Sequence, residues 1–276
     1  MEKAKKYFGE YEMTWARVLI FAVITAVITA VLNLIPALSD TSFQDIAIVI
    51  DCWILFAMFI IMNCKTWKEA SIKTFVFFLV SQPLIYLIEV PFNSMGWQLF
   101  GYYGHWFRLT VLTLPGAAIA FFVKKKNWLS VAVLSVATGY LALAAVDYFY
   151  TLIWRFPHHL ISCIFCIALS LFFIFAFLDE KKHRLAALAI FLVVLIACAV
   201  ISKPDTVADI ELPEGEWSYT AENDSIVSIE AIDGNSFRLK SKSEGNTVVT
   251  FENSDGSITE YYVTVYGGDL LTDVID

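Results

Sequence analysis

Long apolar stretches, broken by short polar segments, occupy residues 1–202 of the chain. A helix rises about 1.5 Å per residue, so roughly 20 apolar residues are needed to cross the hydrocarbon core of a bilayer. Stretches of about this length recur along the chain, and each predicts a transmembrane helix. We expect seven such helices, near residues 17–37, 46–63, 74–92, 107–123, 128–148, 158–178 and 185–202.

After Lys203-Pro204 the pattern changes to short runs in which apolar and polar residues alternate, as in 236–240, 247–251 and 261–265. Alternation with period two is typical of half-buried β-strands, and we expect six or seven of them. Segments rich in Asn, Asp and Gly separate the runs and predict hairpin turns at 222–224, 233–235, 244–246 and 254–256.

Within this C-terminal part, the stretches 219–229, 245–251 and 262–265 resemble the bacterial immunoglobulin-like repeats of the group-2 type, which occur in surface proteins. The resemblance covers roughly residues 206–266. It implies a small antiparallel sandwich that serves as a spacer or adhesive module outside the cell and has no catalytic residues. The predicted fold is therefore a membrane all-α bundle of seven transmembrane helices over 1–202, followed by an extracellular all-β Ig-like sandwich with a short tail over 203–276.

Composition supports the membrane class. Hydrophobic residues make up 58% of the 276 residues and charged residues only 17%, which is too apolar for one water-soluble core. The formal net charge is −8 and no basic patch is evident, so nucleic-acid binding is excluded. The lipid bilayer is thus the first expected partner.

The positive charges predict the orientation of the chain. Most of the 19 Lys and Arg residues precede the first apolar stretch or follow the second, fourth and sixth. The other connections carry Arg108 and Arg155, and Lys203 follows the last stretch. By the positive-inside rule, we expect a multi-pass plasma-membrane protein with a cytoplasmic N-terminus and an extracellular C-terminus. The first stretch is long enough to be a retained span rather than a cleaved signal.

Ionisable residues in or beside the apolar stretches are candidate functional residues, because burying charge in lipid is costly. Those predicted near the outer face are Asp51, Glu89, His105, Arg108, Asp147 and Arg155. Glu89 and Asp147 could pair with Arg108 and Arg155 and so hold the bundle together. Alternatively, the group could form an outward-facing polar pocket for an ion or small solute, or the side chains could reach individually to the headgroups.

A metal site is a further hypothesis. His159, Cys163 and Cys166 have the spacing i, i+4 and i+7, which places them on one helical face, and His158 is adjacent. Nitrogen and sulfur ligands suit Zn or Cu. Cysteine is also a common small apolar residue in spans, so packing is the competing interpretation. No other cofactor is expected, and the C-terminal domain has no cysteine with which to form a disulfide.

Other residues bear on how the helices are built. Ala22, Ala26 and Ala30 form a small-residue face that could meet another span of this chain or a second protein. Pro83 and Pro91 predict breaks in the third helix. The segment 101–104 predicts an aromatic external turn.

No familiar catalytic motif is present, so we expect a non-enzymatic protein. The first functional expectation is a surface or accessory subunit whose Ig-like module binds a partner protein or a cell-wall polymer. The alternative is a transporter or solute-binding subunit for a small solute or ion. An intramembrane enzyme and a sensor or immunity protein are the remaining interpretations.

Overall fold

The computed structural model describes residues 11–48 and 50–275. Contacts divide the chain into two compact units. The first unit comprises Met1–Ala145 and Ile161–Cys198, and the second comprises Val146–Leu160 and Ala199–Asp276. The division near residue 199 lies close to the domain boundary predicted from the sequence. The second unit also takes in the end of one helix and the connection that follows it.

The described part of the chain contains seven helical segments that are long and apolar enough to cross a membrane, as predicted. One of these segments comprises α3 and α4, and another comprises α6 with the flanking 3₁₀ segments Gly96–Leu99 and Phe121–Lys125. The helices are α2 (Trp15–Asn33), α3 (Ser42–Ile48), α4 (Ile50–Met62), α5 (Trp67–Glu89), α6 (Phe100–Ala120), α7 (Trp128–Trp154), α8 (Leu160–Phe177) and α9 (Lys181–Ile201).

Two helices, α5 and α6, begin seven residues earlier than their apolar stretches predict. In α5, the Thr66 side chain caps the helix by accepting from the Glu69 N–H at 3.1 Å, and Glu69 then pairs with Lys73 one turn later at 2.5 Å. In α6, the segment 101–104 forms the first helical turn, so the external turn predicted there is wrong. Ring contacts between α5 and the start of α6 stabilise that turn, a tertiary effect that a local pattern does not contain.

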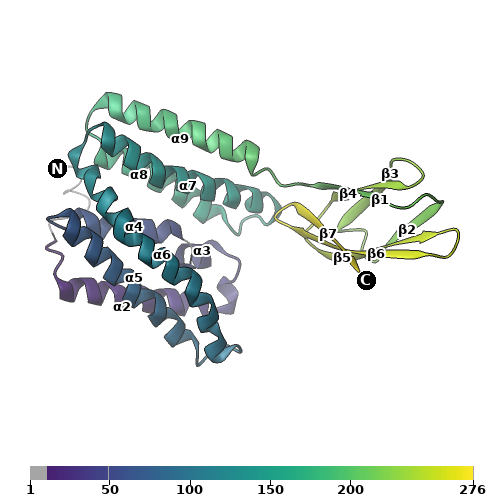
Figure 1. Cartoon of the computed structure of the whole chain (residues 1–276), viewed down its shortest axis with the longest axis horizontal. Coiled ribbons are helices and arrows are strands. Elements are labelled where there is room, and N and C mark those ends of the chain that lie inside the picture. The colour runs from purple at the N-terminus through teal and green to yellow at the C-terminus, as the bar shows by residue number, and fades with distance from the viewer. Residues whose placement is uncertain (1–10, 49, 276) are drawn as a thin grey trace. The chain divides into compact units, whose positions relative to one another are not determined.

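Helix α2 packs against α5, which also packs against α6, and Figure 1 shows the three helices side by side. Ala22, Ala26 and Ala30 are fully buried within this unit. Of the two alternatives for the small-residue face, the structure therefore shows packing within the chain. Rings of Phe21 and Phe77 stack at 5.0 Å between centroids where the two helices meet.

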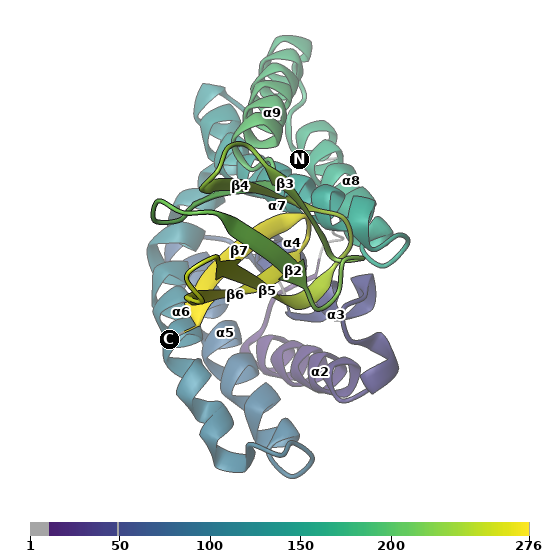
Figure 2. The same cartoon turned by 90° about the vertical axis from the view of Figure 1, so that its right-hand side faces the viewer.

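The C-terminal region contains seven strands in two antiparallel sheets. The three-stranded sheet has the order β1-β4-β3 and the four-stranded sheet the order β2-β5-β6-β7. Figures 1 and 2 show the two sheets lying one over the other. The strands are β1 (Val207–Glu211), β2 (Trp217–Ala221), β3 (Val227–Ala231), β4 (Ser236–Ser241), β5 (Gly245–Asn253), β6 (Ile258–Tyr266) and β7 (Asp269–Ile275).

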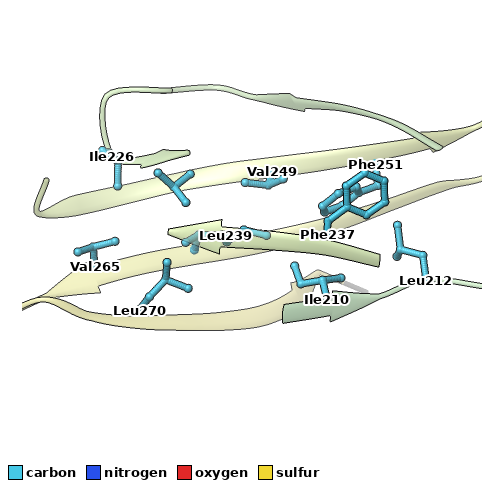
Figure 3. Close-up of a cluster of buried hydrophobic side chains, with 11 residues drawn as sticks. Ile210, Leu212, Ile226, Phe237, Leu239, Val249, Phe251, Val265 and Leu270 are labelled. Atoms are coloured by element: carbon cyan, nitrogen blue, oxygen red, sulfur yellow. The ribbon is translucent and has the colours of Figure 1, made fainter. Parts of the chain in front are cut away.

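A single apolar core lies between these sheets. Figure 3 shows side chains of both sheets pointing toward one another, among them Phe237, Leu239 and Phe251. The rings of Phe237 and Phe251 are 4.9 Å apart between centroids, and both side chains are almost completely buried. The period-two pattern predicted this inward face correctly, because alternate strand residues point to the same side.

The predicted turns fall into two kinds. Segments 233–235 and 254–256 are hairpin turns that join neighbouring strands, as predicted. Segments 222–224 and 244–246 instead carry the chain from one sheet to the other, so the hairpins predicted there are wrong. The β6–β7 hairpin turns at Gly267 and Gly268, whose φ angles are +59° and +93°. Turn residues mark where the chain reverses, but the meeting of apolar faces decides which strands pair.

Candidate functional site

The most unusual ionisable residue of the first unit is Glu89, the last residue of α5. Its side chain is buried, and Asn33, the last residue of α2, donates its Nδ2–H to Glu89 Oε1 at 2.8 Å. In the described part of the chain, Glu89 forms no ion pair with Lys, Arg or His. The pairing of Glu89 with Arg108 that the sequence allowed is therefore not formed.

Glu89 borders a small cavity of about 50 Å³. Gln82, about two helical turns earlier on α5, borders it as well; its side chain is 4% exposed and makes no hydrogen bond to any described residue. The Oδ1 atom of Asn33 is also buried without a hydrogen-bond partner. The cavity is lined by Thr29, Asn33, Trp53, Gln82, Ile85, Tyr86, Glu89 and Trp106.

A second cavity adjoins the first and is larger and apolar. Its volume is about 300 Å³, and it shares Trp53, Gln82 and Trp106 with the polar cavity. Gln82 therefore lies at the boundary of a polar and an apolar space. Pro83, the next residue, stands inside α5 and removes the N–H that would bond to the residue-79 carbonyl. Pro91 lies beyond the end of α5, so it ends this helix rather than breaking it.

Asp51 does not border the Glu89 cavity. It lies in the first turn of α4, and its Oδ2 accepts from Cys166 Sγ at 3.4 Å. Cys163 Sγ donates to the Ala145 carbonyl at 3.5 Å. The two cysteines of the predicted metal site thus contact different groups.

The histidines of that predicted site belong to the second unit. His159 is buried and stacks on Tyr148, with ring centroids 6.0 Å apart, and the His158 N–H donates to the Arg155 carbonyl at 2.8 Å. Among the residues that the structure describes, no group of three or more His, Cys, Asp or Glu is arranged to hold a metal ion. A Zn or Cu site at His158, His159, Cys163 and Cys166 stays a prediction.

Arg155 lies in the connection after α7 and forms an ion pair with Glu244 of the segment before β5. The other oxygen of Glu244 accepts from the Gly267 N–H at 2.8 Å, and the Arg155 guanidinium lies 5.1 Å from the Tyr266 ring. Neither side chain is strongly exposed. The sequence does not indicate this partner, since Glu244 belongs to a polar segment with the composition of an ordinary turn.

The remaining predicted residues are exposed in the structure. His105 and Arg108 are exposed on α6, and Asp147 is exposed on α7. Arg108 makes no hydrogen bond or ion pair with any other described residue. Of the six residues that the sequence grouped at the outer face, Glu89 alone lines the polar cavity.

The outward faces of the two β-sheets differ in chemistry. On the three-stranded sheet four charged side chains form two pairs: Nε and Nη2 of Arg238 bind Asp209 at 2.7 and 2.8 Å, and Lys240 binds Glu230 at 2.8 Å. These bonds lower the pKa of the Asp209 and Glu230 carboxyls below their usual values.

The outward face of the four-stranded sheet combines apolar and acidic residues. Ile258, Tyr262 and Leu271 are 60%, 42% and 60% exposed there. Glu252, Glu260 and Asp273 stand on the same face by strand alternation, and the four strands contain neither Lys nor Arg. We call these six residues the acidic-apolar face.

Comparisons with known proteins identified no relative. The chain matches no protein-family model, no curated protein and no solved structure. The site must therefore be interpreted from its own residues.

Proposed function

We propose that this chain is a non-enzymatic, multi-pass plasma-membrane protein that displays an Ig-like module outside the cell and binds a partner through it. Seven helices of sufficient length and apolarity support the membrane anchor. The distribution of Lys and Arg supports a cytoplasmic N-terminus and an external β region. The two packed antiparallel sheets support the Ig-like sandwich.

The observation that carries the binding function is the acidic-apolar face. Exposed apolar side chains that gather on one face and are rimmed by polar ones mark interaction surfaces. The other sheet of the same unit has an outward face of paired charges, which is what a solvated surface requires. A protein partner with an apolar patch flanked by Lys or Arg complements Ile258, Tyr262 and Leu271 and their acidic neighbours. A cell-wall polymer is the other partner class.

Site-specific photocrosslinking in native membranes tests this function. A photoreactive residue at Leu271 should give one discrete protein adduct, whereas the same residue at Ser228 on the opposite sheet should give none. Tyr262→Ser should weaken the Leu271 adduct at least several-fold without lowering the stability of the β region. A Leu271 adduct that contains wall polymer would select the polymer class. Equal labelling from both positions, or none from either, would exclude this face as a binding surface.

A second function, a transporter or solute-binding subunit, is supported by the cavity at Glu89. A buried carboxylate without a cationic partner is costly within a membrane segment, and such residues mark ion and solute pathways. Glu89→Gln keeps the shape of the side chain and should abolish uptake while the bundle stays folded. Unchanged uptake of every ion and solute tested would leave the carboxylate with a structural role only.

A further inference from the structure

We propose that the polar cavity bordered by Glu89 is a binding site for one small monovalent cation of the Na⁺ class. Its ligands are the Glu89 carboxylate and the side-chain oxygens of Asn33 and Gln82. The inference deepens the second function above by naming the ligand. It rests on that function in that both proposals use the same cavity. It does not require transport, because a cation can bind in the cavity without being carried across the membrane.

Charge is the first reason for a cation. Glu89 is the one ionisable carboxyl among the residues that line the cavity, and no Lys, Arg or His of the described chain pairs with it. Taking an isolated carboxylate out of water costs many kcal/mol unless an opposite charge compensates it. One monovalent cation makes the site neutral, whereas a divalent cation would leave an excess positive charge in an apolar bundle.

The helix ends supply a second, independent reason. Glu89 ends α5 and Asn33 ends α2, so the C-termini of two helices meet at the cavity. Each C-terminus carries about half a negative charge from its unpaired carbonyls, which favours a cation nearby. Neither helix has a basic residue in its last turn, where one would normally balance this charge.

The polar atoms around the cavity are of the kind that binds hard cations. Because Asn33 donates its Nδ2–H to Glu89, its Oδ1 faces away from that bond, and it is buried without a donor. The Gln82 side chain, 4% exposed, borders the cavity and makes no hydrogen bond within the described chain. Carboxylate and amide oxygens are the preferred ligands of hard cations. A bound cation would satisfy these oxygens together.

The size of the cavity excludes larger ligands. Its volume is about 50 Å³, and by the same measure one water molecule needs roughly 10–15 Å³. One ion with a few waters therefore fits. Pockets for organic ligands measure about 300–1,000 Å³. Trp53 and Trp106 also border the space, and indole rings attract cations.

The test uses the full-length protein purified in mild detergent. At equal ionic strength, NaCl should raise the melting temperature by about 2–4 °C relative to choline chloride, because choline is too large for the cavity. Binding of ²²Na⁺ should saturate near one ion per chain. Glu89→Gln should abolish both effects, and Gln82→Leu should weaken ²²Na⁺ binding. Glu12→Gln is the matched control, since Glu12 is exposed and its pair with Lys65 lies at the surface; it should bind ²²Na⁺ normally.

Several results would overturn the proposal. Equal melting temperatures in the two salts without saturable ²²Na⁺ binding would mean that the carboxyl holds a proton or that water alone fills the cavity. Saturable binding that survives Glu89→Gln would place the ion elsewhere. Displacement of ²²Na⁺ by equimolar Ca²⁺ would contradict the monovalent assignment.

The test also separates the cation site from the transport function. Binding of ²²Na⁺ without uptake would reject transport and leave the cation site in place. Uptake without ²²Na⁺ binding would reject the cation site and leave transport in place. If Glu89→Gln does not fold, the wild-type ²²Na⁺ binding curve and the effect of Gln82→Leu on ²²Na⁺ binding test the proposal.

Discussion

At the scale of single residues, the same side-chain type has different roles in different surroundings. Arg108 and Arg155 both stand near the ends of apolar stretches and look alike in the sequence. In the structure, Arg108 is exposed without a partner among the described residues, whereas Arg155 binds Glu244. Partner choice here depends on segments that are far apart in the chain. No local pattern contains that information.

Replacing Arg155 tests the importance of its ion pair. Arg155→Gln should lower the free energy of unfolding of the β region by about 1.5–3 kcal/mol, because a partly buried Glu244 loses a charged hydrogen bond. Pulse proteolysis in urea measures this. Arg238→Gln is the control, since its pair is exposed and screened by water and should therefore cost much less. In a double-mutant cycle, Arg155→Gln and Glu244→Gln should be non-additive. Strict additivity would show that the two side chains do not interact.

The core between the sheets can be tested at Phe251. Its ring is completely buried, so Phe251→Ala should destabilise the β region by about 3–5 kcal/mol through lost burial and an unfilled cavity. Urea-dependent proteolysis again gives the stability. Tyr262→Ala removes a ring of similar size from the acidic-apolar face and should cost far less. Similar losses for the two variants would contradict the inward and outward faces described above.

At the scale of elements, apolar runs predicted which segments are helices but not where each begins. Helix α5 starts at Trp67, ahead of its apolar stretch, because Thr66 and Glu69 satisfy its first turn. Helix α6 starts at Phe100 because rings of α5 pack against its first turn. The residues Thr66 and Glu69 that cap α5 are close together in the sequence, so a local pattern can indicate the cap. The ring contacts join separate helices, so no local pattern indicates them.

The small-residue face of α2 gives a prediction for helix packing. Ala26 is fully buried in the first unit, so Ala26→Leu should overpack the interior and lower thermal stability by about 1–3 kcal/mol. Val27→Leu, on the exposed side of the same helix, should have little effect. Thermal unfolding in detergent measures both. If Ala26→Leu is neutral for stability but disrupts a complex, the alanines instead contact a second protein.

Cross-strand pairs of the three-stranded sheet predict how acid affects the β region. Asp209 and Glu230 have pKa values lowered by Arg238 and Lys240. A carboxyl with a lowered folded-state pKa stabilises above its unfolded pKa, near 4, and this stability is lost as the pH falls through the folded value. Stability should therefore be flat between about pH 5 and 7 and decline below about pH 4. The double variant Asp209→Asn, Glu230→Gln should show a shallower decline; an identical acid profile would contradict the assignment.

At the scale of the whole molecule, the proposed orientation rests on charge rather than on any contact. Most positive residues fall in alternate connections, and the C-terminal region holds most of the acidic residues. A bilayer sorts such segments because positively charged loops stay in the cytosol. The proposed binding function depends on this orientation, since the acidic-apolar face must lie outside the cell.

Thiol labelling measures the orientation directly. The five native cysteines are buried or half-buried. They are first replaced, so that only the introduced cysteine can be labelled. A membrane-impermeant maleimide applied to intact cells should label Ser254→Cys, in the exposed β5–β6 turn, and not Lys181→Cys at the start of α9. Permeabilised cells should show both labelled. Protection of Ser254→Cys until permeabilisation would reverse the orientation and reject the display function.

The sequence by itself predicted the seven apolar helices, six or seven strands, and the alternating faces of the runs 236–240, 247–251 and 261–265. These features follow from hydrophobic periodicity, which depends only on neighbours along the chain. The tertiary structure decided which turns join strands of one sheet, which residue pairs with Arg155, and that Glu89, Asn33 and Gln82 border one cavity. Such contacts join residues from separate elements, and their energies depend on distance and burial, which exist only once the helices and sheets have packed.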